Sequence, residues 1–62
     1  MYEKFAELLE KNGITSYRIY KETGVSQSLL SAWKNGKSRP KIDKLQKIAK
    51  FFDIPIDYFL ED

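Results

Sequence analysis

The stretch SYRIYKETGVSQSLLSAWKNG, residues 16–36, decides the fold of this chain. Its first part carries apolar side chains at helical spacing, and Gly24 then supplies a residue that tolerates the left-handed backbone at a helix end. Ser26 follows closely, and a serine before good helix formers can accept a hydrogen bond from the amides of the next turn. The stretch therefore predicts helices over residues 16–23 and 27–35, joined by a tight turn.

The two predicted helices must cross steeply, because only residues 24–26 separate them. A steep crossing after so short a link is the geometry of a helix-turn-helix rather than of an antiparallel hairpin. Helical spacing places Leu30 and Trp33 on the inward side of the second helix. Its outward side is predicted to carry small and polar residues, namely Gln27, Ser28, Ser31 and Ala32.

These outward residues are of the types that recognise bases in the major groove of DNA. A glutamine can form a bidentate pair with an adenine edge, a serine can bond to either base type, and an alanine can contact a thymine methyl group. We expect Gln27, Ser28 and Ala32 to read bases, with Ser31 as a fourth candidate. Each residue alone is more simply explained as part of a solvated helix face, but together, before a basic loop, they favour DNA recognition.

The net charge of +2 is distributed unevenly along the chain. Residues 1–33 are balanced, and residues 51–62 carry only acidic side chains. Positive charge is concentrated directly after the predicted reading helix, where backbone phosphates would lie if that helix entered a groove. The segment 34–50 contains one acid, Asp43, and seven basic residues: Lys34, Lys37, Arg39, Lys41, Lys44, Lys47 and Lys50.

Two groups can be distinguished among these cations. We expect Lys37, Arg39 and Lys41 to bind phosphates, and Lys34 is free to do the same. Lysines 44, 47 and 50 are more simply explained as the solvated face of a further helix. The opposite, inward face of that helix would carry Ile42, Leu45, Ile48, Ala49 and Phe52.

The rest of the chain predicts three more helices, over residues 2–12, 41–52 and 55–60. Asn12-Gly13 is a strong breaker pair that ends the first of them, and Pro40 can precede a helix but not continue one. No strand pattern is present in the sequence. The aromatic residues Trp33, Phe51, Phe52 and Phe59 are expected to fill the core, together with Tyr2, Phe5, Leu8 and Leu9 from the first helix.

Length and composition restrict the function further. A chain of 62 residues makes a single domain, residues 1–62, with room for one function. It has no cysteine and no histidine, which removes thiol nucleophiles, thiolate metal sites and the usual neutral-pH base. We therefore expect no enzyme activity, no cofactor and no metal. The sequence has no apolar run that could cross a bilayer and no signal-peptide pattern, so the expected location is the cytoplasm.

Residues 13–60 resemble the Cro and phage-repressor helix-turn-helix family, also called the XRE family. The resemblance covers nearly the whole chain, and five separate pieces occur in order at the family's spacing. The residues that carry it are Gly13-Ile14-Thr15, Gly24-Val25-Ser26-Gln27-Ser28, Trp33-Lys34-Asn35-Gly36-Lys37, Pro40 with Leu45 and Ile48-Ala49, and the closing segment Ile54 to Leu60.

The resemblance implies a compact, all-α, five-helix lambda-repressor-like domain that acts as a prokaryotic or phage transcription regulator. Its third helix would enter the major groove, with the domain as one half of a homodimer on a palindromic DNA operator. Residues matching Gln27, Ser28 and Ala32 commonly read bases in the family. Residues matching Ser16, Tyr17, Asn35, Lys37 and Arg39 commonly contact phosphates, and Lys41 matches a position near the backbone or the minor groove.

Some positions depart from the family pattern. Tyr20 stands where a small residue is usual, so either its ring leans outward or the helix crossing opens. Leu29 either packs against the fourth helix or lies at the groove. Leu9 and Lys34 replace an arginine and a glutamate that pair in many relatives. Ser16 replaces a glutamine that can support the residue matching Gln27.

Two function classes remain open from the sequence. The first is a sequence-specific DNA-binding module, acting as a transcriptional repressor or regulator. The second is a protein-interaction or antitoxin-like module that keeps the fold and uses Leu29, Tyr58 or Leu60 as its contact. The basic segment after the reading helix favours the first class. The sequence also leaves open whether this domain is a complete protein or the first part of a longer one.

Overall fold

The computed structural model describes residues 1–60, and these residues form five α-helices without any strand. The helices are α1 (Tyr2–Asn12), α2 (Ser16–Thr23), α3 (Gln27–Lys34), α4 (Ile42–Phe52) and α5 (Asp57–Leu60). The predicted all-α, five-helix fold is confirmed. The predicted bounds of the first two helices are also those of the structure.

The other three helices are each slightly shorter than predicted. Asn35 caps α3 rather than extending it, and Lys41 adopts extended backbone (φ −74°, ψ 169°) as the N-cap of α4. α5 begins at Asp57 and not at Pro55. Pro55 and Ile56 precede it and supply carbonyl oxygens that accept from the amides of Tyr58 and Phe59, at 3.0 and 2.9 Å. Hydrogen bonds between residues three apart are typical of a 3₁₀ turn, so they tighten the start of the helix without adding an α-helical turn.

The turn between α2 and α3 is built as the sequence predicts. Gly24 adopts the left-handed conformation (φ 80°), and its amide donates to the carbonyl oxygen of Tyr20 at 2.9 Å. Val25 is fully buried and anchors the turn in the core. The Ser26 hydroxyl then accepts a hydrogen bond from the Leu29 amide at 3.1 Å, which caps α3. The turn therefore fixes where α3 starts and how it leaves the core.

We expect Ser26→Ala to lower the free energy of unfolding by about 1 kcal/mol, because the Leu29 amide loses its capping acceptor. Thr15→Ala is the matched control. Thr15 occupies the same position before α2, but its side chain makes no capping hydrogen bond. Urea denaturation followed by circular dichroism measures both variants. Equal losses would contradict the role of the Ser26 hydroxyl.

All five helices contribute side chains to the core, and α2 packs against α3 and α4. Phe5 and Trp33 stack with ring centroids 5.0 Å apart, and Phe59 meets Trp33 edge-on at 6.3 Å. The prediction that Ile42 faces inward is wrong: the side chain is 52% exposed, because it lies in the first turn of α4 at a surface hollow. The buried hydrophobic residues of the core are Phe5, Leu8, Ile19, Val25, Leu30, Trp33, Leu45, Ile48, Ala49 and Phe59.

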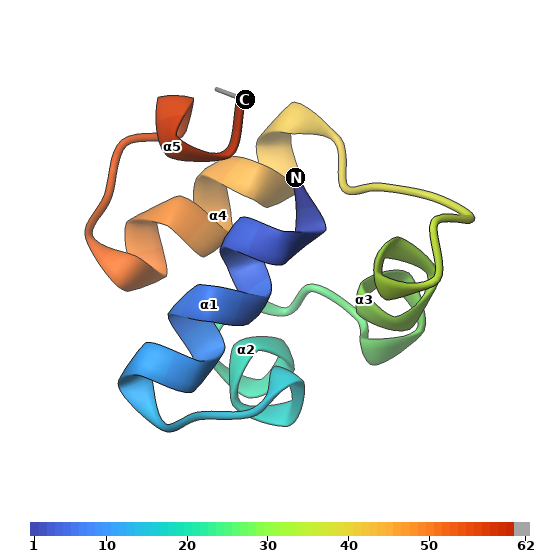
Figure 1. Ribbon diagram of the computed structural model, residues 1–62, viewed down its shortest axis with the longest axis horizontal. Helices are drawn as coiled ribbons and strands as arrows, with labels where there is room; N and C mark the ends of the chain where they lie inside the picture. Colours follow the sequence, from blue (N-terminus) through green and yellow to red (C-terminus); the bar gives the residue numbers. More distant parts are fainter. Residues whose placement is uncertain (61–62) are drawn as a thin grey trace.

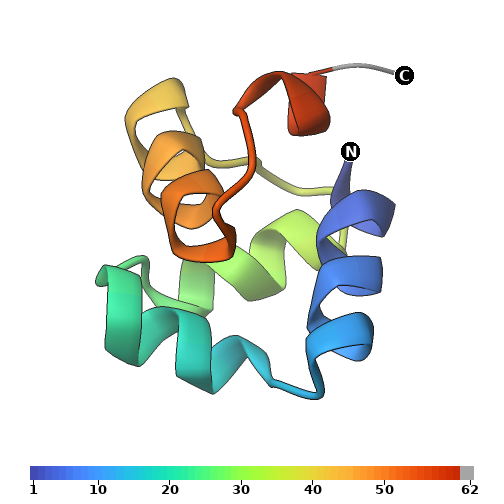
Figure 2. The ribbon, with the colours of Figure 1, turned by 90° about the vertical axis from the view of Figure 1, so that its left-hand side faces the viewer.

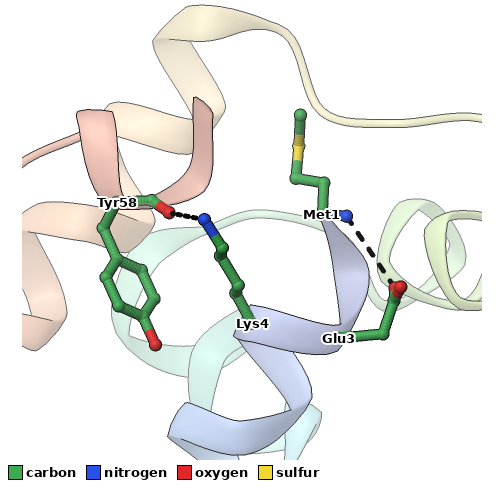
Figure 3. Close-up of polar contacts among 4 residues, drawn as sticks. All are labelled: Met1, Glu3, Lys4 and Tyr58. Atoms are coloured by element: carbon green, nitrogen blue, oxygen red, sulfur yellow. Dashed lines mark hydrogen bonds and ion pairs between the residues drawn. The ribbon is translucent and has the colours of Figure 1, made fainter. Parts of the chain in front are cut away.

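Figure 1 shows α3 at one edge of the molecule, with the loop to α4 running along the same edge. The view turned by 90° places α1 and α4 on opposite sides of α3 (Figure 2). α1 and α5 are joined on the side away from α2 by Lys4, whose Nζ donates to the carbonyl oxygen of Tyr58 at 2.9 Å (Figure 3). The buried side chains of α3 pack against the core, and its opposite face lies at the surface.

Candidate nucleic-acid interface

The outward face of α3 is at the surface of the protein. Gln27, Ser28 and Ser31 are exposed, and Ala32 is half-buried. The inward side chains Leu30 and Trp33 are only 2% and 5% exposed, so the predicted division of the helix into two faces is present. Ala32 thus has less free surface than predicted, and its carbonyl oxygen accepts a hydrogen bond from the Lys37 amide of the following loop at 2.9 Å.

The loop after α3 presents its basic side chains to solvent. Gly36 is left-handed (φ 72°), and its amide donates to the Trp33 carbonyl oxygen at 3.1 Å, which reverses the chain directly after the helix. Pro40 is buried and fixes the far end of the loop. The basic side chains from the last turn of α3 to the start of α4 are exposed, and none of them forms an ion pair within the described residues. They are Lys34, Lys37, Arg39 and Lys41.

Two adjacent hollows lie beside α3, and they gather many of the predicted site residues. The first, which we call the α2-side hollow, has a volume of about 440 Å³ and lies between α1, the start of α2 and α3. The second, the loop-side hollow, has a volume of about 420 Å³ and lies between the start of α1, the end of α3 and the basic loop. Ser16, Gln27, Ser31 and Lys34 line the first; Lys34, Lys37 and Arg39 line the second.

The other predicted site residues lie outside these two hollows. Neither hollow is lined by Ser28 or Ala32. Tyr17 is 54% exposed, with its ring 6.1 Å from that of Tyr20. Asn35 donates from Nδ2 to the Ser31 carbonyl oxygen at 3.0 Å, so its amide is already used to close α3. Lys41 borders a separate hollow at the start of α4.

The structure also decides the orientations that the sequence left open. The ring of Tyr20 leans outward and is 41% exposed, so the crossing of α2 and α3 need not open to accommodate it. Leu29 is partly buried and packs against the core. It is therefore less available for contact with a groove or a partner.

Sequence reasoning assigned Tyr2 and Leu9 to the core, but both line the α2-side hollow. Both are partly buried rather than enclosed. They lie on α1 seven residues apart, on the stripe at the edge of its apolar face. This edge position is the only signal in the sequence that could have indicated a surface role.

Within residues 1–60 no group of acidic side chains is placed to hold a metal ion. In the same part of the chain, none of the helices has the length and apolar character that a bilayer crossing requires.

A family model described as "Helix-turn-helix" matches residues 5–59. The HTH-type transcriptional activator BcrR of Enterococcus faecalis is 33% identical over 58 residues, which cover 94% of this chain and 28% of that protein. The chain thus spans less than a third of this relative's length. No solved structure matches the chain.

The family match spans α1 to α5 and includes the turn, the exposed helix and the basic loop described above. The chain is therefore a member of the helix-turn-helix family of the XRE/Cro type, whose domains are DNA-binding parts of transcription regulators and not enzymes.

Proposed function

We propose that this domain binds double-stranded DNA in a sequence-specific way by inserting α3 into the major groove, and that it regulates transcription from that site. The observation that carries the proposal is the exposed polar face of α3, bordered on one side by cations that no acidic side chain of the described residues neutralises. The polar face can form hydrogen bonds with base edges, and the cations can bind phosphates.

Two sets of residues would contact the DNA, one at the bases and one at the phosphates. The base readers are Gln27, Ser28, Ser31 and Ala32, with the exposed amide of Gln27 suited to an adenine edge. Phosphate contacts fix the orientation of the protein and provide most of the affinity that does not depend on sequence. The proposed phosphate contacts are Ser16, Tyr17, Lys34, Asn35, Lys37, Arg39 and Lys41.

We propose further that two copies bind a palindromic operator. One α3 spans only eight residues and reads a single half-site, so strong specificity requires a second copy. The domain represses where its operator overlaps a promoter, because it then occupies the groove that the polymerase needs. The relative named above is an activator, and its longer chain includes parts that this sequence does not match.

Selection of bound duplexes from a random pool, followed by sequencing, tests this function directly. The expected result is a palindrome with half-sites about one helical turn apart. The affinity for the selected site should also fall with salt, with a log-log slope near −0.9 for each of about four to six phosphate contacts per monomer. Enrichment of no sequence, together with an affinity that salt does not change, would favour the protein-interaction alternative.

We expect Arg39→Ala to weaken binding to the selected site and to random duplexes by the same factor. The arginine is proposed to contact a phosphate, which is present in every sequence. The salt slope should become shallower by about 0.9, since one fewer counterion-releasing contact is made. Lys11→Ala removes the same charge at the far end of α1, beside Glu7 and Glu10, and should leave the slope unchanged. A changed sequence preference with an unchanged slope would contradict the assignment.

A further inference from the structure

Among the described residues, only Tyr2 and Lys34 border both hollows. Both side chains line the α2-side hollow and the loop-side hollow, so together they form the ridge that separates them. Lys34 comes from the last turn of α3 and Tyr2 from the first turn of α1. The ridge is therefore built from two elements that are far apart in the sequence.

The ring of Tyr2 is held in one place by the core. It meets the Trp33 ring edge-on at a centroid distance of 5.4 Å, and the Phe5 ring at 5.8 Å. Trp33 and Phe5 are themselves buried and stacked on each other. Edge-to-face contacts with buried rings restrict the rotamer of a tyrosine, so its hydroxyl is presented at a fixed point.

The hydroxyl of Tyr2 is available to a ligand. It forms no hydrogen bond to another residue in the described part of the chain, and that part contains no buried side-chain oxygen or nitrogen without a partner. The hydroxyl is therefore in contact with solvent. A tyrosine that served only to fill the core would not need this oxygen, since phenylalanine makes the same ring contacts.

The surroundings of this hydroxyl fit an anion. Lys34 lines the same two hollows as Tyr2, and Lys37 and Arg39 line the loop-side hollow. Among residues 1–60, Glu3 is the one acid that borders either hollow, and its carboxylate lies 3.8 Å from the amino nitrogen of Met1. The α2-side hollow also reaches Gln27 and Ser31 on the proposed reading helix. A DNA strand followed outward from those residues would cross the ridge.

We propose that Tyr2 is a DNA-contacting residue, whose hydroxyl donates a hydrogen bond to a backbone phosphate held jointly with Lys34. The inference rests on the proposed DNA-binding function and names a contact beyond the set given for it. Successive phosphates of the strand occupy the two hollows, with the ridge between them. Because the Tyr2 ring is fixed on Trp33, the contact also sets how far α3 enters the groove.

This contact has a thermodynamic signature that separates it from the lysine contacts. A phenol carries no charge, so its loss changes the affinity without changing the number of counterions released. We expect Tyr2→Phe to weaken binding about three- to tenfold on the selected duplex and on a random duplex of the same length. The salt slope and the melting temperature should stay as in the unmodified chain.

The experiment measures the affinity of the whole chain for both duplexes over a range of salt. Tyr58→Phe is the matched control, because it removes a phenol oxygen from α5 beside Glu7 and Glu10 and should leave the affinity unchanged. Equal affinity of Tyr2→Phe and the unmodified chain would overturn the proposal. If the unmodified chain binds neither duplex, the proposed function fails instead, so the two failures are distinguishable.

A second measurement identifies the phosphate itself. Duplexes in which one phosphate at a time is replaced by a neutral methylphosphonate are bound to the unmodified chain and to Tyr2→Phe. We expect one position at which the two proteins bind equally, because the contact removed from the protein is already missing from the DNA. A difference that persists at every position would overturn the proposal, since it would show that Tyr2 acts through the fold alone.

Discussion

Trp33→Ala is expected to lower the free energy of unfolding by about 3–5 kcal/mol, the largest effect of any single change considered. The indole is 5% exposed and contacts three other rings, those of Tyr2, Phe5 and Phe59. Alanine removes these contacts and leaves a cavity that the short helices around it cannot fully close. A domain of this length has about 3–9 kcal/mol of stability in total, so most of it would be lost.

Thermal and urea denaturation followed by circular dichroism measure this effect. Trp33→Phe is the control, since a phenylalanine keeps a ring against Phe5 and should lose clearly less stability. For a domain of this size, each kcal/mol corresponds to about 4–8 °C in the melting temperature. A melting temperature of Trp33→Ala equal to that of the unmodified chain would refute the role of the indole in the core.

Gln27→Ala is expected to cost about 1–3 kcal/mol of binding free energy on the selected site, which is about a 5- to 150-fold loss of affinity. The reason is that Gln27 is exposed in the first turn of α3, where its amide can bond to a base edge through both of its polar atoms. Random duplexes lack the matching base, so the loss on them should be far smaller. Competition binding with both duplexes measures the difference.

Gln46→Ala provides the matched control for this prediction. Gln46 is also an exposed helical glutamine, but it lies on α4. The same chemical change there should leave the affinity for both duplexes unchanged, and neither variant should alter the melting temperature. An equal loss on the selected and random duplexes would show that Gln27 does not read a base.

The sequence determined the features of this protein that depend on local interactions. A glycine at position 24 ends α2, and a serine two residues later caps α3; both effects act within a few residues of the chain. The separation of α3 into a buried and an exposed face follows from helical period in the same way. Fold class, helix order and the position of the polar face were therefore predictable before any tertiary contact was known.

The outer limits of the helices were less predictable. Lys41 and Pro55 are compatible with a helix start, yet both stay outside the helices that follow them. Local propensity is similar for both alternatives at such positions, so the surrounding packing selects between them.

Only the tertiary structure decided which residues at the edges of the apolar stripes reach the surface. Ile42 and Tyr2 both fit the inward pattern of their helices, but Ile42 lies at a surface hollow at the start of α4, and Tyr2 forms part of a ridge with Lys34. The physical reason is that periodicity gives only the direction in which a side chain points around the axis of its helix. How much of that face a neighbouring helix covers depends on where the helices cross, and residues distant in the sequence set that crossing.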